Sequence, residues 1–486
     1  MSRTRFVLST WVILALLSAC GPQAYPAGTV STGESASTPA GPTATFQPTR
    51  PQFQPGELVD YVAQTGDTLP ALASHFNTTA AEIRAANPQI PLDATTMPPG
   101  MPMKIPIYYL PFWGTSYQIL PDSLFVNGPL AVAFDTEAFV ATHPGWLKDY
   151  RTYAGAANRT GAQLVDFVAG NFSLDPRLLL AILEYQTGAL SSPTAPETVY
   201  PLGYRQRTHA SLYLQLIWAA NTLNNGYYGW RTGDLTVIER GDGTFERPDP
   251  WQNAATVGLQ YYYSRLYTGV EYNLAIGPDG LARTFAELFG DPWTVDVPHI
   301  PVSLQQPELR LPFQAGEFWA YTGGPHTGWG TGAPFAAIDF APPAVIGGCT
   351  PTDRPVLAMA DGVVARVDTG IVVLDLDGDG DERTGWVLFY LHVGTAGRAA
   401  LGASLRAGDQ VGYPSCEGGT STGTHIHIAR KYNGEWIPAD GPLAFVLDGW
   451  TAHNGEAPYE GTLTRGEQIV IACDCSDAAS QVQAGR

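Results

Sequence analysis

The chain has 486 residues and a net charge of −19, from 45 acidic and 26 basic side chains. A chain of this length is expected to form several domains. The acidic balance argues against nucleic acid as a partner, because phosphate binding needs clustered Lys and Arg. Beyond residue 20, no segment of the sequence is long and apolar enough to predict a membrane span.

The first twenty residues predict export. Arg3 and Arg5 precede an apolar run from residue 6 to residue 17, which is too short to cross a bilayer and is typical of a signal peptide. The run ends in LSAC, which resembles the lipobox of bacterial lipoproteins. That resemblance implies lipid modification of Cys20 and a cell-envelope protein anchored to the membrane from outside the cytoplasm. An ordinary secretory signal is the alternative, and it also predicts export.

Residues 21–55 are rich in Pro, Thr, Ser, Gly and Ala, which predicts a disordered linker without a core of its own. The pattern changes in the segment YVAQTGDTLPALASHF, where Asp67 or Thr68 can cap a helix whose apolar residues recur at helical spacing. Residues 56–108 resemble a LysM module, a strand-helix-helix-strand domain that binds N-acetylglucosamine-containing glycans. A degenerate module that only packs against its neighbours is the alternative.

Residues 109–300 predict a mainly helical domain. In NFSLDPRLLLAILEYQTGAL, Asp175 is placed to cap a helix that starts at Pro176. The segment resembles the lysozyme-like fold of lytic transglycosylases, in which a similar helix ends in a catalytic Glu. Here Gln186 takes that place, and an amide cannot donate the proton that glycosidic cleavage requires. Glu184 is about 200° round the helix, so the domain is expected to be non-catalytic unless the alignment slips by one register.

The last third of the chain predicts antiparallel strands with histidines on them. In THIHI, His425 and His427 are two residues apart and project from one face of a strand, and Tyr390 and His392 are expected to share a face in the same way. Imidazole nitrogens and the isolated Asp339 carboxylate suit zinc, with a fourth position open for water. Alternation alone does not say which of the paired histidines contacts the metal.

This part of the chain resembles the LytM/lysostaphin class of cell-wall zinc endopeptidases, peptidase family M twenty-three. Most members place the first ligand His four residues before the Asp, where this chain has Phe335. The staphylolysin branch places it thirteen residues before, after Gly-Gly, as in TGGPHTGWGTGAPFAAIDF. The resemblance therefore implies His326, Asp339 and His427 as zinc ligands. It leaves His392 and His425 as catalytic residues.

The sequence thus predicts a multidomain α+β protein: a LysM βααβ module, a mainly helical lysozyme-like middle domain and an antiparallel β-sheet peptidase domain at residues 301–455, with a C-terminal extension at 456–486. The expected function is zinc-dependent hydrolysis of stem or bridge peptides in peptidoglycan. A non-catalytic scaffold or activator of other murein hydrolases, and a transglycosylase acting through the middle domain, are the alternatives.

Two smaller features of the sequence are a cluster of aspartates and four cysteines after Cys20. Asp375, Asp377 and Asp379 imitate the start of a calcium loop, but the twelfth position, which needs a bidentate Glu, is Trp386. A weak calcium site and an acidic hairpin turn are therefore equal alternatives. Among the four cysteines after Cys20, an oxidising compartment favours a bond between Cys349 and Cys416, whereas Cys473 and Cys475 would lie about 6.6 Å apart on an extended chain, near the limit for a disulfide.

Overall fold

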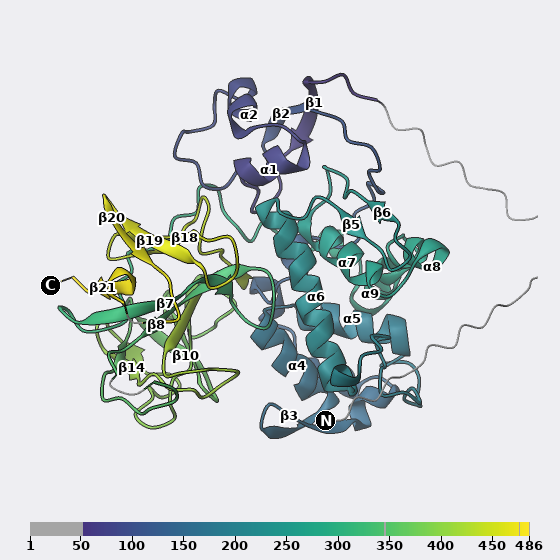
Figure 1. Ribbon diagram of the computed structural model, residues 1–486. Helices are drawn as coiled ribbons and strands as arrows, with labels where there is room; N and C mark the ends of the chain where they lie inside the picture. Colours follow the sequence, from purple (N-terminus) through teal and green to yellow (C-terminus); the bar gives the residue numbers. More distant parts are fainter. Residues whose placement is uncertain (1–51, 345–346, 476, 486) are drawn as a thin grey trace, which may run out of the picture. The chain divides into compact units, whose positions relative to one another are not determined.

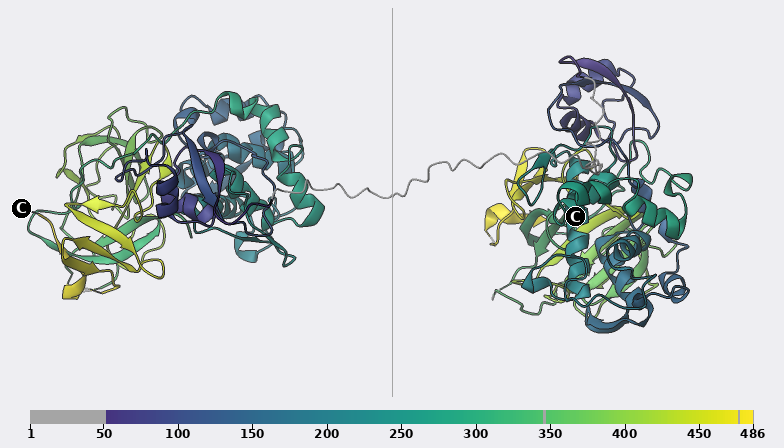
Figure 2. Two further views of the ribbon diagram at one scale, coloured as in Figure 1. Left: turned by 90° about the horizontal axis from the view of Figure 1, so that it is seen from above. Right: turned by 90° about the vertical axis from the view of Figure 1, so that its right-hand side faces the viewer.

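The N-terminal region of the computed structural model consists of two short strands and two short helices, in the order that the sequence predicts. These are β1 (Glu57–Val62), α1 (Leu69–His75), α2 (Ala80–Ala86) and β2 (Pro102–Ile107), with β1 and β2 paired antiparallel. Figure 2 shows this pair of strands with the helices beside it. Thr68 caps α1 by accepting from the Ala71 backbone N–H, while Asp67 is buried and accepts from the Tyr61 hydroxyl at 2.7 Å. We call residues 57–107 the βααβ region.

The helical region, residues 122–294, has α6 as its longest helix, with 21 residues. Its helices are α3 (Thr136–Ala141), α4 (Gly161–Phe172), α5 (Pro176–Thr187), α6 (Leu212–Thr232), α7 (Ala254–Ser264), α8 (Gly269–Ala275) and α9 (Leu281–Phe289). Two hairpins join them, β3 (Arg151–Ala154) with β4 (Ala157–Thr160), and β5 (Ile238–Glu239) with β6 (Phe245–Glu246). The predicted start of α5 is confirmed, because the Asp175 side chain accepts from the Arg177 backbone N–H at 2.8 Å.

The sheet region, residues 318–483, contains a nine-stranded antiparallel sheet in the order β13-β10-β11-β12-β15-β8-β7-β21, with β16 paired to β15 (Figure 1). Its strands are β7 (Phe318–Thr327), β8 (Phe335–Ala341), β10 (Gly362–Asp368), β11 (Ile371–Asp375), β12 (Trp386–Leu391), β13 (Ser404–Leu405), β15 (Ile426–Tyr432), β16 (Glu435–Trp436) and β21 (Gln481–Gln483). Smaller sheets pair β9 (Val356–Leu357) with β14 (Gln410–Gly412), and link β17 (Val446–Leu447), β18 (Trp450–Asn454), β19 (Gly461–Arg465) and β20 (Gln468–Ile471). The segment expected as a C-terminal extension thus supplies strands to this region.

The two faces of the large sheet belong to different hydrophobic cores. One face packs within the sheet region itself and includes Ile338, Phe340, Tyr390, Ile426 and Ile428. The other face shares a continuous core with the helical region and includes Ala337, Val373, Phe389, Ala429 and Trp436. Because side chains alternate along a strand, Asp339 and His427 lie on this second face, two residues from Ala337 and Ala429. The helical region therefore covers the face that bears the candidate ligands.

The structure describes residues 52–344, 347–475 and 477–485, and the residues from Gln52 onward form one compact unit. The expected signal peptide, Cys20 and nearly all of the linker lie outside the described residues. No described helix is long and apolar enough to cross a membrane. The predicted bond between Cys349 and Cys416 is confirmed, with Cα atoms 5.8 Å apart. Cys473 and Cys475 are also bonded, because the backbone bends and brings their Cα atoms to 5.1 Å.

Glu382 gives a testable prediction about acid stability. Its carboxylate lies 2.6 Å from Arg366 and 2.8 Å from Lys431. Burial alone raises the pKa of Glu382, but these two charges outweigh burial, so the pKa falls to about 2. A carboxyl whose pKa falls on folding stabilises the protein above its unfolded pKa, and this contribution is lost as the pH falls through about 2. Glu382→Gln is expected to lower the free energy of unfolding at pH 7 by about 3–5 kcal/mol, because it leaves the buried Lys431 ammonium without its carboxylate partner and removes the ion pair with the partly exposed Arg366.

Denaturant unfolding of both proteins between pH 7 and pH 2 measures this effect. The difference between wild type and Glu382→Gln should shrink as the pH falls below about 4.5. Glu467→Gln, which neutralises an exposed carboxylate of the same region, is the control and should stay within about 0.5 kcal/mol of wild type. A pH-independent difference for Glu382→Gln would contradict the account.

Candidate metal centre

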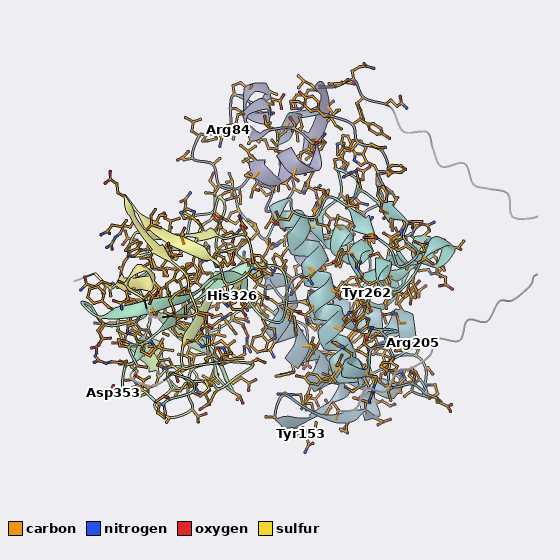
Figure 3. All side chains as sticks on the ribbon, in the orientation of Figure 1. Arg84, Tyr153, Arg205, Tyr262, His326 and Asp353 are labelled. Atoms are coloured by element: carbon orange, nitrogen blue, oxygen red, sulfur yellow. A yellow bond between two sulfur atoms is a disulfide. The ribbon has the colours of Figure 1, made fainter. Side chains whose placement is uncertain are left out.

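Three neighbouring strands bring the three predicted ligands together. The register pairs His427 on β15 directly with Asp339 on β8, and on the other side of β8 it pairs His326 of β7 with Ala337. All three ligand side chains are buried, with 2–6% of each residue exposed. Figure 3 shows His326 within the sheet region. Adjacent strands lie about 4.8 Å apart, so residues distant in sequence meet at one point on the sheet.

The ligand atoms have the spacing that a tetrahedral metal requires. His326 Nε2 lies 3.0 Å from His427 Nδ1, and each of these nitrogens lies 3.3 Å from Asp339 Oδ1. Ligand atoms that are each about 2.0–2.1 Å from a tetrahedral zinc are about 3.3 Å from one another. Asp339 Oδ1 is buried and accepts no well-directed hydrogen bond from the described residues. These atoms therefore fit a divalent cation, and among the described residues they form a buried group able to hold one.

Backbone carbonyls fix the orientation of both histidine ligands. His326 Nδ1 lies 2.8 Å from the Gly324 carbonyl oxygen, and His427 Nε2 lies 3.1 Å from that of Gly328. A carbonyl only accepts hydrogen bonds, so these ring nitrogens carry the protons and the opposite nitrogens keep their lone pairs. Gly323 is required beside them, because a Cβ there would lie 2.6 Å from Asp339 Oδ2.

The protonation states suit metal binding. Burial alone raises the pKa of Asp339, but the charge of His326 and the neighbouring hydrogen bonds hold this pKa well below its usual range. Burial lowers the pKa of His427. Burial, with the charges of His425 and His427, also lowers the pKa of His392 to about 4. Burial alone lowers the pKa of His326, but the Asp339 charge and the hydrogen bonds to Asp339 and Gly324 outweigh burial and raise it. At neutral pH the site thus offers a carboxylate and, at His392 and His427, neutral imidazoles, and metal binding at His326 displaces its proton.

The two remaining histidines stand beside the ligand group. His425 Nε2 lies 3.7 Å from Asp339 Oδ2, and its Nδ1 is held by the Gly423 carbonyl at 2.8 Å. The rings of His392 and His425 have centroids 4.5 Å apart, and His392 Nδ1 is held by the Glu417 carbonyl at 2.9 Å. Each of these histidines therefore has one free ring nitrogen, Nε2, for proton transfer.

The expectation that Tyr390 and His392 share a face is wrong. Strand β12 ends at Leu391, and His392 has a left-handed backbone with φ of 67°. This turn breaks the alternation, so the His392 ring lies beside His425, while the Tyr390 hydroxyl accepts from the Met359 backbone N–H in the core of the opposite face. The local backbone, and not strand periodicity, brings His392 to the site.

Tyr459 is a site residue that sequence reasoning missed. Its ring stacks on that of His326 with centroids 4.0 Å apart, and half of the residue is exposed. The Tyr459 carbonyl accepts from the Gly324 backbone N–H at 2.7 Å, which joins it to the strand of the first ligand. Burial, followed by the Asp339 charge, raises the pKa of Tyr459. It belongs to the segment expected as an extension, and no motif in the sequence singled it out.

The aspartates at 375–379 form a turn. Asp375 Oδ2 accepts from the backbone N–H groups of Gly378 and Gly380, and Asp377 Oδ1 accepts from that of Asp379. These bonds close the loop between β11 and β12, so the hairpin turn accounts for the cluster, and calcium is not supported.

In the helical region, the side chains at the two positions considered for a catalytic acid are held by local hydrogen bonds. Glu184 Oε2 accepts from the backbone N–H groups of Leu190 and Ser191, while the amide oxygen of Gln186 accepts from the Tyr262 hydroxyl at 2.7 Å.

Comparison with known proteins gives two family matches. Residues 61–106 match the LysM domain, and residues 118–303 match the LasA N-terminal domain. Two curated proteins named Protease LasA, from Pseudomonas aeruginosa strains UCBPP-PA14 and ATCC 15692, are 26% identical over 345 residues, which cover 66% of this chain and 75% of the relative.

Two solved structures are also similar to part of the chain. The M23 metalloprotease pseudoalterin from the deep sea is 22% identical and covers 34% of this chain and 96% of its own, with a TM-score of 0.29. The catalytic domain of lysostaphin from Staphylococcus simulans is 19% identical and covers 26% of this chain and 89% of its own, with a TM-score of 0.18.

The matches agree with the predicted resemblance to a peptidase that carries a LysM domain. Among curated proteins the chain is similar to Protease LasA, and the similarity extends to its helical region through the match to the LasA N-terminal domain.

Substitution of the histidines is expected to separate metal binding from catalysis. His326→Ala and His427→Ala each remove one of three ligands, so zinc content should fall from about one per chain to background. His392→Ala and His425→Ala should keep zinc and lose peptidase activity by about 10²–10⁴-fold, the usual contribution of a general acid or base. Metal analysis after gel filtration and a peptide-hydrolysis assay measure the two effects.

His453→Ala is the matched control, because this histidine is in the same region with 41% of its side chain exposed. It should retain both zinc and activity. A His427→Ala protein that kept full zinc content would refute the ligand assignment.

Proposed function

We propose that this chain is a zinc-dependent endopeptidase that hydrolyses peptide bonds in the stem or bridge peptides of peptidoglycan, and that its LysM domain binds the N-acetylglucosamine-containing glycan. The single observation that carries this proposal is the set of three ligand atoms within 3.3 Å of one another, with Asp339 Oδ1 buried among them. The similarity to Protease LasA and the LysM match support the same function.

The proposed mechanism assigns a task to each site residue. His326 Nε2, Asp339 Oδ1 and His427 Nδ1 would hold zinc, which supplies a net charge near +1 that polarises a peptide carbonyl and lowers the pKa of water to about 7. His425 Nε2 and His392 Nε2 orient the attacking water, accept its proton and return a proton to the leaving amine. The carbonyls of Gly423 and Glu417 keep these two nitrogens free by holding the Nδ1 protons.

The proposed location is the cell envelope outside the cytoplasm. A signal peptide at residues 1–20 and lipid modification of Cys20 would anchor the chain to the membrane, and the linker that follows would let the LysM domain reach the wall. After the linker, the proposed domain boundaries place the LysM domain at residues 56–108, the helical domain at residues 109–300 and the peptidase domain from residue 301.

Two other functions are less well supported. A scaffold or activator of other hydrolases would not need an intact ligand set, and here His326, Asp339 and His427 are all within ligand distance of a common point. A transglycosylase would need a free acid in the helical region, where Glu184 is bound to backbone N–H groups and Gln186 is an amide.

Digestion of purified peptidoglycan tests the proposal. The full chain loaded with zinc is expected to release peptides with new free amino groups, and a chelator or His427→Ala should abolish the release. Mass spectrometry of the products would identify the bond. Anhydro-sugar products would support the transglycosylase instead, and the absence of any product from a zinc-loaded, folded chain would contradict the proposal.

A further inference from the structure

Residues 299–304, which we call the strap, lie across two loops of the βααβ region. Thr65 in the β1–α1 loop accepts from the Ile300 backbone N–H at 3.0 Å. In the α2–β2 loop, Thr96 donates its hydroxyl to the Pro301 carbonyl at 2.8 Å, and Thr95 donates to the Leu304 carbonyl at 2.7 Å. The backbone N–H of Leu304 returns a bond to Thr96 at 3.1 Å. The hydroxyl groups of two loops of the βααβ region are therefore occupied by a turn of the same chain.

The strap is also buried against the sheet region. Ile300 and Leu304 are 2% and 5% exposed and form a cluster with Ile437, whereas Val302 points to solvent and is 53% exposed. At the start of the strap, His299 Nε2 lies 2.6 Å from Glu435 Oε2. The strap thus contacts both the βααβ region and the sheet region.

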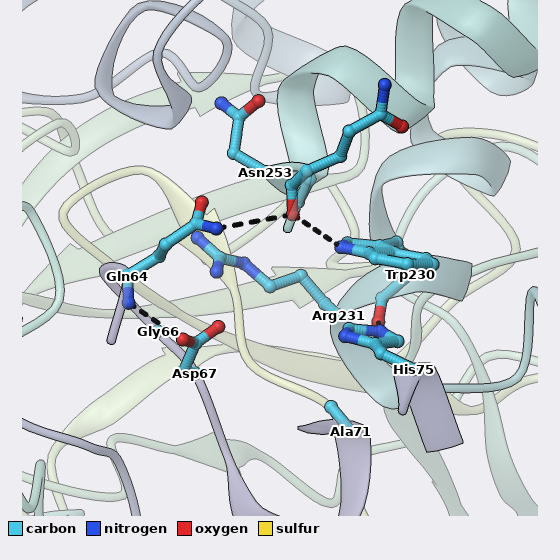
Figure 4. A pocket seen from close by; sticks show the side chains of 10 residues that line it. Gln64, Gly66, Asp67, Ala71, His75, Trp230, Arg231 and Asn253 are labelled. Carbon is cyan, nitrogen blue, oxygen red and sulfur yellow. Dashed lines mark hydrogen bonds between the residues drawn. The ribbon is translucent and has the colours of Figure 1, made fainter. Parts of the chain in front are cut away.

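Arg231 on α6 makes the same connection from the helical region. Its guanidinium lies 3.0 Å from Glu435 Oε1 and 3.0 Å from Asp122 Oδ2, and it donates to the Thr65 carbonyl. A Cβ at Gly66 would lie 2.7 Å from the guanidinium carbon, so the LysM loop fits closely around this arginine. Figure 4 shows Arg231 reaching toward Gly66 and Asp67. Displacement of this loop would remove a hydrogen bond from Arg231, which lies beside Glu435.

Helix α6 in turn holds the loop between two metal ligands. Asn221 accepts from the Thr331 backbone N–H at 2.7 Å, and Asn225 accepts from that of Ala333 at 2.6 Å. This loop joins His326 to Asp339, and the core shared with the helical region covers the sheet face that bears the ligands. The helical region therefore covers part of the face that bears the ligands, and the ligands themselves are only 2–6% exposed.

We propose that N-acetylglucosamine oligosaccharide competes with the strap for the Thr65, Thr95 and Thr96 surface, and that glycan binding opens the peptidase. The threonine hydroxyl groups that bind the backbone of the strap can donate and accept hydrogen bonds. They can therefore bind the hydroxyl and acetamido groups of a sugar chain in the same way. A ligand that binds only the strap-free form shifts the equilibrium toward that form. The coupling is reciprocal, so opening the strap must strengthen glycan binding by the same factor. Both readouts rest on the proposed function, the binding readout on glycan binding by the LysM domain and the activity readout on the peptidase.

Ile300→Asp tests the proposal in the full chain. A charge placed in the apolar cluster should release the strap, so the Kd for the N-acetylglucosamine pentamer, measured by calorimetry, should fall by roughly tenfold. The rate of hydrolysis of a short soluble peptide should rise by a similar factor. The pentamer should accelerate the wild-type protein and leave Ile300→Asp unchanged, because that variant is already open.

Val302→Asp is the matched control, since it adds the same charge to the exposed side of the strap and should match wild type in both assays. Leu304→Ala, which removes apolar contacts and keeps the backbone bonds, is the second variant should Ile300→Asp fail to fold, and it should change Kd and rate in the same directions. An unchanged Kd in the folded variants, or binding of the pentamer to wild type without acceleration, would overturn the proposal. A lowered Kd with no hydrolysis by any variant would support the competition and count against the proposed function.

Discussion

The direct pairing of His427 with Asp339 across β15 and β8 is the contact on which the site depends. It sets two ligand atoms 3.3 Å apart, and β7 adds His326 within the same distance. A slip of one residue in this register would turn one ligand to the opposite core. The apolar alternation of Ile426 and Ile428 against Ile338 and Phe340 prevents such a slip, because it would expose that whole core. Packing of the face that carries these apolar residues therefore fixes the geometry of the ligand atoms on the opposite face.

The sheet face that bears the ligands is also constrained by the helical region, because the two share one hydrophobic core. Glu435 accepts hydrogen bonds from Arg231 and Tyr227 on α6 and from His299 in the strap, so two segments separate in sequence meet at one buried carboxylate of the sheet region. Burial alone raises the pKa of Glu435, but the charges of Arg231 and His299 outweigh it and lower this pKa to about 2. The ionised carboxylate thus holds the helical region, the strap and the sheet region together.

Sequence reasoning succeeded where local chemistry decides the structure. The Asp175 cap follows from a short pattern, the βααβ order from the resemblance to LysM modules, and the Cys349–Cys416 bond from the expected oxidising compartment. The choice of His427 over His425 as a ligand came from resemblance, because alternation treats the two alike. The position of His392 depends on one left-handed backbone angle, and Tyr459 reaches His326 from 133 residues away, since 459 − 326 = 133. Such contacts are set by tertiary packing, which no local pattern encodes.

X-ray absorption of the zinc-loaded full chain at the zinc edge tests the central claim most directly. The account predicts two imidazole nitrogens at about 2.0–2.1 Å and a carboxylate oxygen at about 2.0–2.2 Å, with a water oxygen at the fourth position. The imidazole signal should fall by one ligand in His326→Ala if any metal is retained. A spectrum with sulfur neighbours, or one that is unchanged when His326 and His427 are both replaced, would contradict it.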